Sequence, residues 1–155
     1  MMRHFMDSLD LLKDCAIIVF SKLGLGVVLM KTIIQTKNAP AAIGTYSQAV
    51  IHGDTLYTSG QIPLIPESGE MIENDFSKQT HQVFKNLQAI AIAANTSLQN
   101  TLKLNIFVQD LSHFATLNEI MSEYFEQPYP ARAAIQVAGL PKDAMVEMDA
   151  IIALR

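Results

Sequence analysis

Two charged residues, Arg132 and Glu147, lie in segments that otherwise have the composition of apolar β-strands. Side chains alternate between the two faces of a strand, so Glu147 and Asp149 are expected on one face of the last strand. Arg132 is followed by two alanines, which leave room beside its guanidinium, and this planar group can bind a carboxylate through two parallel hydrogen bonds. The residues alone leave two interpretations open: an anion-binding pocket at Arg132, or a structural ion pair between Arg132 and Glu147 or Asp149.

The common motifs of triad hydrolases, zinc hydrolases and nucleotide-binding loops are absent, namely Gly-x-Ser-x-Gly, His-Glu-x-x-His and the Walker sequence. The four histidines, His4, His52, His81 and His113, lie far apart in the sequence and have no ligand spacing. The single cysteine, Cys15, has no intrachain partner for a disulfide and cannot form a zinc-binding cysteine cluster. These features predict a protein of a reducing, cytoplasmic compartment without a metal site.

The composition indicates one folded domain without a basic surface for nucleic acid. Half of the 155 residues are apolar and 17% are charged, so the chain can bury a core. Eleven Lys and Arg against fifteen Asp and Glu give a net charge of −4, with no basic run. Since phosphate binding needs a basic stripe, no nucleic-acid partner is expected. The aliphatic stretch 15–30 spans 16 residues and contains Lys22, which is too short for a membrane helix of roughly 20 apolar residues, so no membrane partner is expected either.

Turn residues and β-branched runs divide the chain from residue 31 onward into short extended segments. Six strands are predicted, at residues 31–36, 49–51, 55–59, 102–108, 132–137 and 145–154. The tight turn His52-Gly53-Asp54 joins the second strand to the third as a hairpin.

Two helices are predicted between these strands. Asn74 or Asp75 is expected to cap a helix that runs to about Ala94, and Ser112 is expected to cap a second helix that ends near Phe125. The order of elements indicates an α+β fold in which both helices cover one face of a single sheet.

The run PARAAIQVAGLPKDAMVEM at residues 130–148 resembles the signature of the reactive intermediate deaminase family, the RidA- or YjgF-type proteins. Three further regions are similar to the same family: NAPAAIGTYSQ at 38–48, TSGQIP at 58–63, and FVQDL with FATLN at 107–111 and 114–118. The resemblance covers residues 31–155 as one deaminase domain. It leaves out residues 1–30, which we expect to be an extension upstream of the natural start.

The resemblance implies a chorismate-mutase-like fold with a single mixed sheet, a homotrimer, and three sites between subunits. It implies hydrolysis of enamines and imines such as 2-aminoacrylate, released by pyridoxal-phosphate enzymes, to a 2-keto acid and ammonia without cofactor or metal. By the same resemblance, Arg132 would hold the substrate carboxylate, and Glu147 would orient and activate water. The residues implied to line the site are Tyr46, Ser59, Gly60, Asn118 and Ala134.

Several of these positions also have structural interpretations. Tyr46 can be a packed aromatic residue, Asn118 a residue of a helix face, and Ser59-Gly60 the end of a strand. The family commonly has Cys, Ser or Thr where this chain has Ala134, so a contact from this position must come from its backbone. Two other functions stay open: an endoribonuclease or translation inhibitor, as family members have been described, and a ligand-binding or holdase protein without turnover. The lack of a basic groove argues against the first of these.

Overall fold

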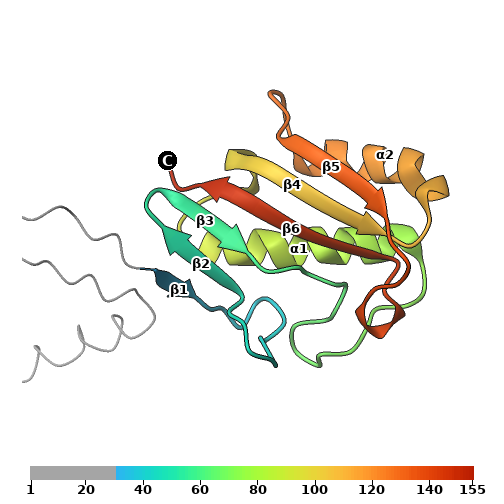
Figure 1. The fold of residues 1–155 in the computed structure, drawn as a ribbon, viewed down its shortest axis with the longest axis horizontal. Helices are drawn as coiled ribbons and strands as arrows, with labels where there is room; N and C mark the ends of the chain where they lie inside the picture. The colour runs from blue at the N-terminus through green and yellow to red at the C-terminus, as the bar shows by residue number, and fades with distance from the viewer. Residues whose placement is uncertain (1–30) are drawn as a thin grey trace, which may run out of the picture.

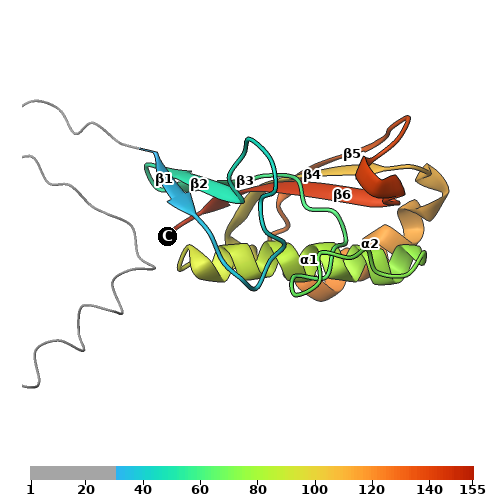
Figure 2. The same cartoon turned by 90° about the horizontal axis from the view of Figure 1, so that it is seen from below.

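The computed structural model describes residues 31–155, and the extension predicted for residues 1–30 lies outside the described residues. In this part of the chain, six strands form one sheet and two α-helices lie along one of its faces (Figure 1; Figure 2). The strands are β1 (Thr32–Ile34), β2 (Ala49–His52), β3 (Thr55–Thr58), β4 (Thr101–Val108), β5 (Ala131–Gln136) and β6 (Val146–Ala153). The helices are α1 (Phe76–Ala93) and α2 (Phe114–Tyr124). The predicted α+β fold is confirmed. No helix among residues 31–155 is long and apolar enough to cross a bilayer.

The sheet is mixed, and its strand order is β1-β2-β3-β6-β4-β5. Neighbouring strands are antiparallel except for β4 and β5, which are parallel. A parallel pair needs a crossover connection, and α2 provides it. The predicted hairpin turn closes with Gly53 at a φ of 61°, a left-handed conformation that glycine adopts without steric cost.

Helix α1 packs its apolar face on the sheet. Of the two predicted caps, Asn74 and Asp75, the structure has Asp75, whose side chain accepts a hydrogen bond from the backbone N of Lys78 at 2.9 Å. Val83, Leu87 and Ile90 recur at the i, i+4, i+7 spacing of one helix face, and all three are fully buried. This burial holds α1 against the sheet.

Strand β6 alternates between a buried face and an open face, as its sequence predicts. The buried residues are Val146, Met148, Ala150 and Ile152, which are at most 1% exposed. Glu147 and Asp149 alternate with them and lie on the opposite face. Figure 2 shows that α1 and α2 both lie on one side of the sheet.

Helix α2 begins later than predicted, and the assignment of Ser112 as its cap is wrong. Asp110 accepts a hydrogen bond from the backbone N of Ser112 at 2.7 Å and caps a short 3₁₀ turn, η3 (Leu111–His113). The α-helix starts at Phe114 without a side-chain cap. The physical reason is that Asp110 starts the 3₁₀ turn two residues earlier, so Ser112 lies inside this turn and not at its start.

Apolar side chains are exposed on the face of the sheet that the helices leave open. The strand register aligns Ile33, Tyr57 and Ile135 on this face together with Glu147. Their exposed fractions are 48%, 42% and 51%, respectively. An apolar sheet face that is left uncovered is typical of a surface that packs against another layer.

Candidate active site

The strand register places Arg132 and Glu147 on opposite faces of the sheet. Glu147 lies opposite Phe107 of β4, and Phe107 lies beside Ile135 of β5, on the open face. Arg132 lies beside Leu104, which is fully buried under the helices. The ion pair of Arg132 with Glu147 or Asp149 that the sequence left open therefore does not form within this chain.

Arg132 is held by helix α2. Its Nη1 donates a hydrogen bond to Oδ1 of Asn118 at 2.6 Å and lies 3.1 Å from Sδ of Met121. Its Nε and Nη2 have no hydrogen-bond partner among residues 31–155. One edge of the guanidinium is thus anchored, while the other edge keeps the two donors that bind a carboxylate.

Ala134 shares the strand face of Arg132. It lies beside Ile106 of β4, which is buried, and packs against the core. Its side chain therefore belongs to the packing under Arg132, and only its backbone on the edge strand β5 is left for contact with a ligand.

Glu147 lies at a cavity of about 680 Å³ on another part of the molecule. Tyr46, Ser59 and Gly60 line the same cavity, so the structure brings together four of the seven predicted site residues. The rest of the lining is largely apolar and includes Ile43. This cavity has room for a small organic acid and a water molecule.

Gly60 allows the cavity to reach Glu147. A Cβ built on residue 60 would overlap Oε1 of Glu147, so only glycine leaves this carboxylate in place. Two backbone hydrogen bonds hold this close approach: N of Gln61 donates to O of Met148 at 2.8 Å, and N of Met148 donates to O of Gln61 at 3.1 Å. The sequence suggested Ser59-Gly60 only as part of the site lining. In the structure this strand end determines the position of the Glu147 carboxylate.

Tyr46 and Ser59 contribute to the cavity in different ways. Tyr46 is 51% exposed, so it is not the packed aromatic residue that the sequence left open. The Ser59 hydroxyl donates to the backbone O of Ser47 at 2.6 Å, which fixes the loop that carries Tyr46. Ser59 therefore positions the wall of the cavity, while the Tyr46 phenol is free to meet a ligand.

Burial raises the pKa of Glu147 above its usual value, and the nearby Asp149 carboxylate raises it further. Asp149 itself accepts a hydrogen bond from Nδ2 of Asn105 at 2.8 Å. Arg132 of the same chain does not act on this pKa, because it lies on the other face of the sheet.

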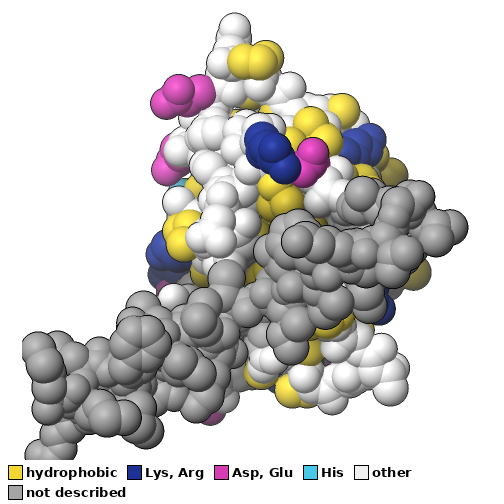
Figure 3. All heavy atoms as spheres, turned by 90° about the vertical axis from the view of Figure 1, so that its left-hand side faces the viewer, with side chains coloured by type: hydrophobic (Ala, Val, Ile, Leu, Met, Phe, Trp, Pro, Cys, Tyr) yellow, Lys and Arg dark blue, Asp and Glu magenta, His cyan; other side chains and the backbone are white. Residues whose placement is uncertain are grey.

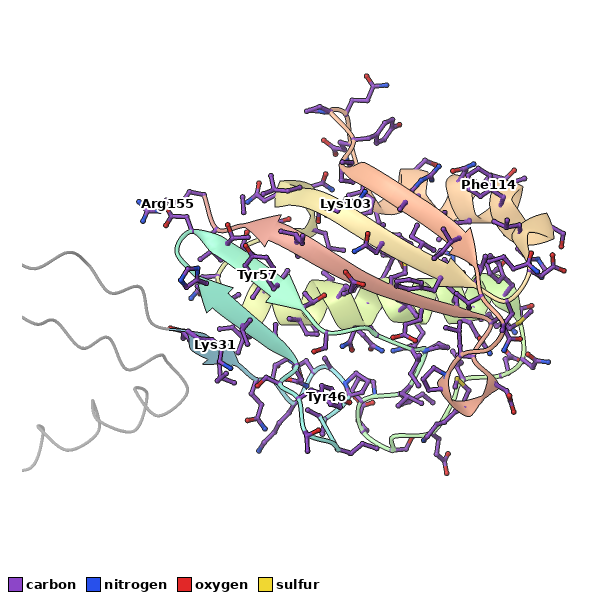
Figure 4. The ribbon with its side chains drawn as sticks, in the orientation of Figure 1. Lys31, Tyr46, Tyr57, Lys103, Phe114 and Arg155 are labelled. Carbon is purple, nitrogen blue, oxygen red and sulfur yellow. The ribbon has the colours of Figure 1, made fainter. Side chains whose placement is uncertain are left out.

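The predicted site residues therefore form two separate groups. We call Tyr46, Ser59, Gly60 and Glu147 the carboxylate group, and Arg132, Asn118 and Ala134 the guanidinium group. Tyr46 and Phe114, an aromatic neighbour of Arg132, are well separated in Figure 4. The carboxylate group contains Glu147, the residue expected to activate water. The guanidinium group contains Arg132, the residue expected to bind the substrate carboxylate.

Sequence reasoning missed Met121 and Phe114 as contacts of Arg132. Their spacing around Asn118 is i, i+4, i+7 on one helix, and this signal was available in the sequence. Among residues 31–155, no group of three or more His, Cys, Asp or Glu side chains is placed to hold a metal ion.

Comparison with known proteins identifies the family of this chain. A family model described as Endoribonuclease L-PSP matches residues 36–154. The 2-iminobutanoate/2-iminopropanoate deaminase of Rattus norvegicus is 43% identical over 79% of this chain and 90% of its own length. The structure of RidA from the Antarctic bacterium Psychrobacter sp. is 51% identical, with a TM-score of 0.75 over 77% of this chain and 97% of that one. The structure of E. coli TdcF with bound serine is 42% identical, with a TM-score of 0.73 over 78% and 97% of the two chains. The chain therefore belongs to the reactive intermediate deaminase family of RidA- or YjgF-type proteins.

Proposed function

We propose that this protein hydrolyses enamines and imines of 2-amino acids, such as 2-aminoacrylate released by pyridoxal-phosphate enzymes, to 2-keto acids and ammonia. A relative at 43% identity carries the name of this activity, and a similar structure holds serine, a small 2-amino acid. The single observation that carries the proposal is the Arg132 guanidinium, whose Nη1 is anchored by Asn118 while Nε and Nη2 remain available for a carboxylate.

The two groups of site residues would meet between copies of the chain. The guanidinium group lies beside the edge strand β5, and the carboxylate group lies at the cavity beyond β6. In a homotrimer packed through the apolar open faces, with the edge strand β5 of one subunit at the cavity of the next, Arg132 would reach Glu147 across the interface. A cyclic arrangement of this kind places three identical sites at three interfaces.

The chemistry needs few groups, because an enamine tautomerises to an imine whose carbon is already electrophilic. Arg132 would hold the substrate carboxylate, and Glu147 would orient a water molecule and take its proton as the oxygen bonds to the imine carbon. On the protonated imine this step gives a neutral carbinolamine, which loses ammonia when Glu147 returns the proton to nitrogen and the C–N bond breaks. The Glu147 carboxylate then takes the proton of the carbinolamine hydroxyl. The carbinolamine oxygen becomes the carbonyl of the 2-keto acid, and no covalent nucleophile is required.

The environment of Glu147 suits a proton acceptor. Its raised pKa makes the carboxylate a stronger base than an exposed glutamate. An arginine from the partner subunit would lower this pKa again and keep the carboxylate ionised at neutral pH. Burial and the partner's arginine would thus act on the pKa of Glu147 in opposite directions.

The charge distribution favours a small acid over RNA as the substrate. The net charge of the chain is −4, although the name of the matching family model refers to an endoribonuclease. Figure 3 shows basic and acidic side chains interspersed on the uncovered part of one face, without a broad basic patch. An RNA-cleaving site needs a positively charged track for the phosphate backbone.

The deciding experiment measures ammonia and 2-keto acid release from freshly generated 2-aminoacrylate. The wild type should accelerate both, and Glu147→Gln should keep its fold while kcat falls by about 10²- to 10⁴-fold. Glu126→Gln, at an exposed position away from the cavity, is the matched control and should retain full activity. If the wild type releases neither product faster than buffer, or cleaves RNA instead, the proposal is wrong.

A further inference from the structure

One face of helix α2 is directed at the Arg132 guanidinium. Phe114, Asn118 and Met121 recur at the spacing i, i+4, i+7, which aligns three side chains along an α-helix. The Cζ of Arg132 lies 5.0 Å from the centroid of the Phe114 ring, within the range of a cation–π interaction. The contacts from Asn118 and Met121 both go to Nη1.

These contacts constrain the guanidinium unequally. The hydrogen bond from Nη1 to Asn118 fixes one end of the group, but by itself it lets the guanidinium plane turn about that end. The Cζ of Arg132 lies over the Phe114 ring, so the ring limits the space into which the group can turn. Nε and Nη2, which have no partner among residues 31–155, then point in one defined direction as a fork for a carboxylate.

We propose that Phe114 is a positioning residue for substrate binding, which fixes the plane of the Arg132 guanidinium so that its Nε–Nη2 edge is ready for the carboxylate of an imino acid. This inference rests on the proposed role of Arg132. Phe114 acts through Arg132 and touches no reacting atom. The value of the ring lies in preorganisation: an arginine that is already oriented loses little side-chain entropy when the ligand binds.

Phe114→Leu tests this role because it removes the aromatic face and keeps an apolar side chain. We expect KM to rise roughly 2- to 12-fold while kcat changes less than about twofold, since ordering a freed arginine weakens ground-state and transition-state binding equally. Phe114→Tyr keeps the ring and should restore the wild-type KM. Leu111→Ala is the matched control, because Leu111 is 43% exposed against 38% for Phe114 and precedes the same helix. It should leave KM unchanged.

A second measurement separates this inference from the proposed reaction. Calorimetric titration with 2-oxobutanoate, a carboxylate of the product class, reports binding without turnover, and Phe114→Leu should weaken it by the same factor as KM. In an Arg132→Lys background, Phe114→Leu should cause no further loss, because the planar fork is already gone. Unchanged affinity in Phe114→Leu, no rescue by Phe114→Tyr, or an undiminished loss in the Arg132→Lys background would overturn the role of Phe114. If the wild type binds the keto acid but releases no ammonia, the proposed function fails and the titrations still decide this inference.

Discussion

Gly60 and Glu147 approach so closely that a Cβ at position 60 would overlap Oε1 of the carboxylate. The loop that carries Gly60 is tied to β6 by the paired backbone hydrogen bonds of Gln61 and Met148. The sequence suggests Gly60 only as part of the site lining. In the structure this glycine determines the position of Glu147, the proposed base.

Gly60→Ala should lower kcat by at least about tenfold with little change in the thermal unfolding midpoint. The added methyl group meets the end of a flexible side chain, which can move, and displacing a catalytic group by about 1 Å can cost roughly 10²-fold in rate. Gly139→Ala is the control, because a Cβ at residue 139 meets no atom within 4 Å. Wild-type kcat in Gly60→Ala, measured by keto-acid release, would remove Glu147 from the mechanism.

Arg132→Lys should fail nearly as badly as Arg132→Ala. Each should reduce kcat/KM by roughly 10- to 150-fold, which corresponds to about 1.5–3 kcal/mol for a hydrogen-bonded charged group, because an ammonium lacks the two parallel donors of the guanidinium. Arg155→Lys changes the same residue type at an exposed pair with Asp54 and should have no effect on kinetics. Near-wild-type kinetics of Arg132→Lys would show that charge alone is sufficient, contrary to the bidentate role.

Mixing two inactive variants tests whether the site is shared between subunits. In a trimer that contains both Arg132→Ala and Glu147→Gln chains, one of the three interfaces pairs an intact Arg132 with an intact Glu147. After subunit exchange, an equal mixture should therefore recover about a quarter of wild-type activity, since about three quarters of the trimers are mixed. The unmixed variants serve as controls. No recovery, despite exchange demonstrated by mass spectrometry, would place both residues in one subunit's site.

Asp149→Asn should move the acid limb of the pH–activity profile to lower pH. Glu147 has to be ionised to accept a proton, so activity rises as the pH passes its pKa, and the Asp149 carboxylate raises that pKa. Removing the like charge lowers the pKa of Glu147 and extends activity into more acidic solution. The readout is kcat/KM against pH, with Asp54→Asn on the distant hairpin as the control. A shift to higher pH would exclude Glu147 as the titrating base.

Ile135→Asp should convert the protein to folded monomers that lack deaminase activity. Ile135 is 51% exposed on the open face of the edge strand, where we expect the subunits to pack, and a charge there would have to be buried without a partner. Ile92→Asp is the control, because Ile92 is 63% exposed on helix α1 and lies outside the sheet. Sedimentation equilibrium distinguishes the outcomes: an Ile135→Asp trimer, or a wild-type monomer at micromolar concentration, contradicts this interface.

The sequence by itself determined the elements that depend on local interactions. The cap at Asp75 and the turn at Gly53 follow from the backbone preferences of those residues, and both are confirmed. The separation of Glu147 from Met148 in β6 follows from alternation within one strand, and the structure has the same two faces. The cap at Ser112 was wrong, because Asp110 starts a 3₁₀ turn two residues earlier and Ser112 lies inside that turn.

Only the tertiary structure decided how Arg132 relates to Glu147. Alternation assigns each residue to a face of its own strand, but it does not say which face of β5 aligns with which face of β6. That alignment depends on β4, which pairs with β5 in parallel and with β6 in antiparallel register, through hydrogen bonds between segments far apart in the sequence. The packing of α2 over β5 then gave Arg132 its partner Asn118. One proposed site became two groups because strand pairing is a long-range property that no local pattern encodes.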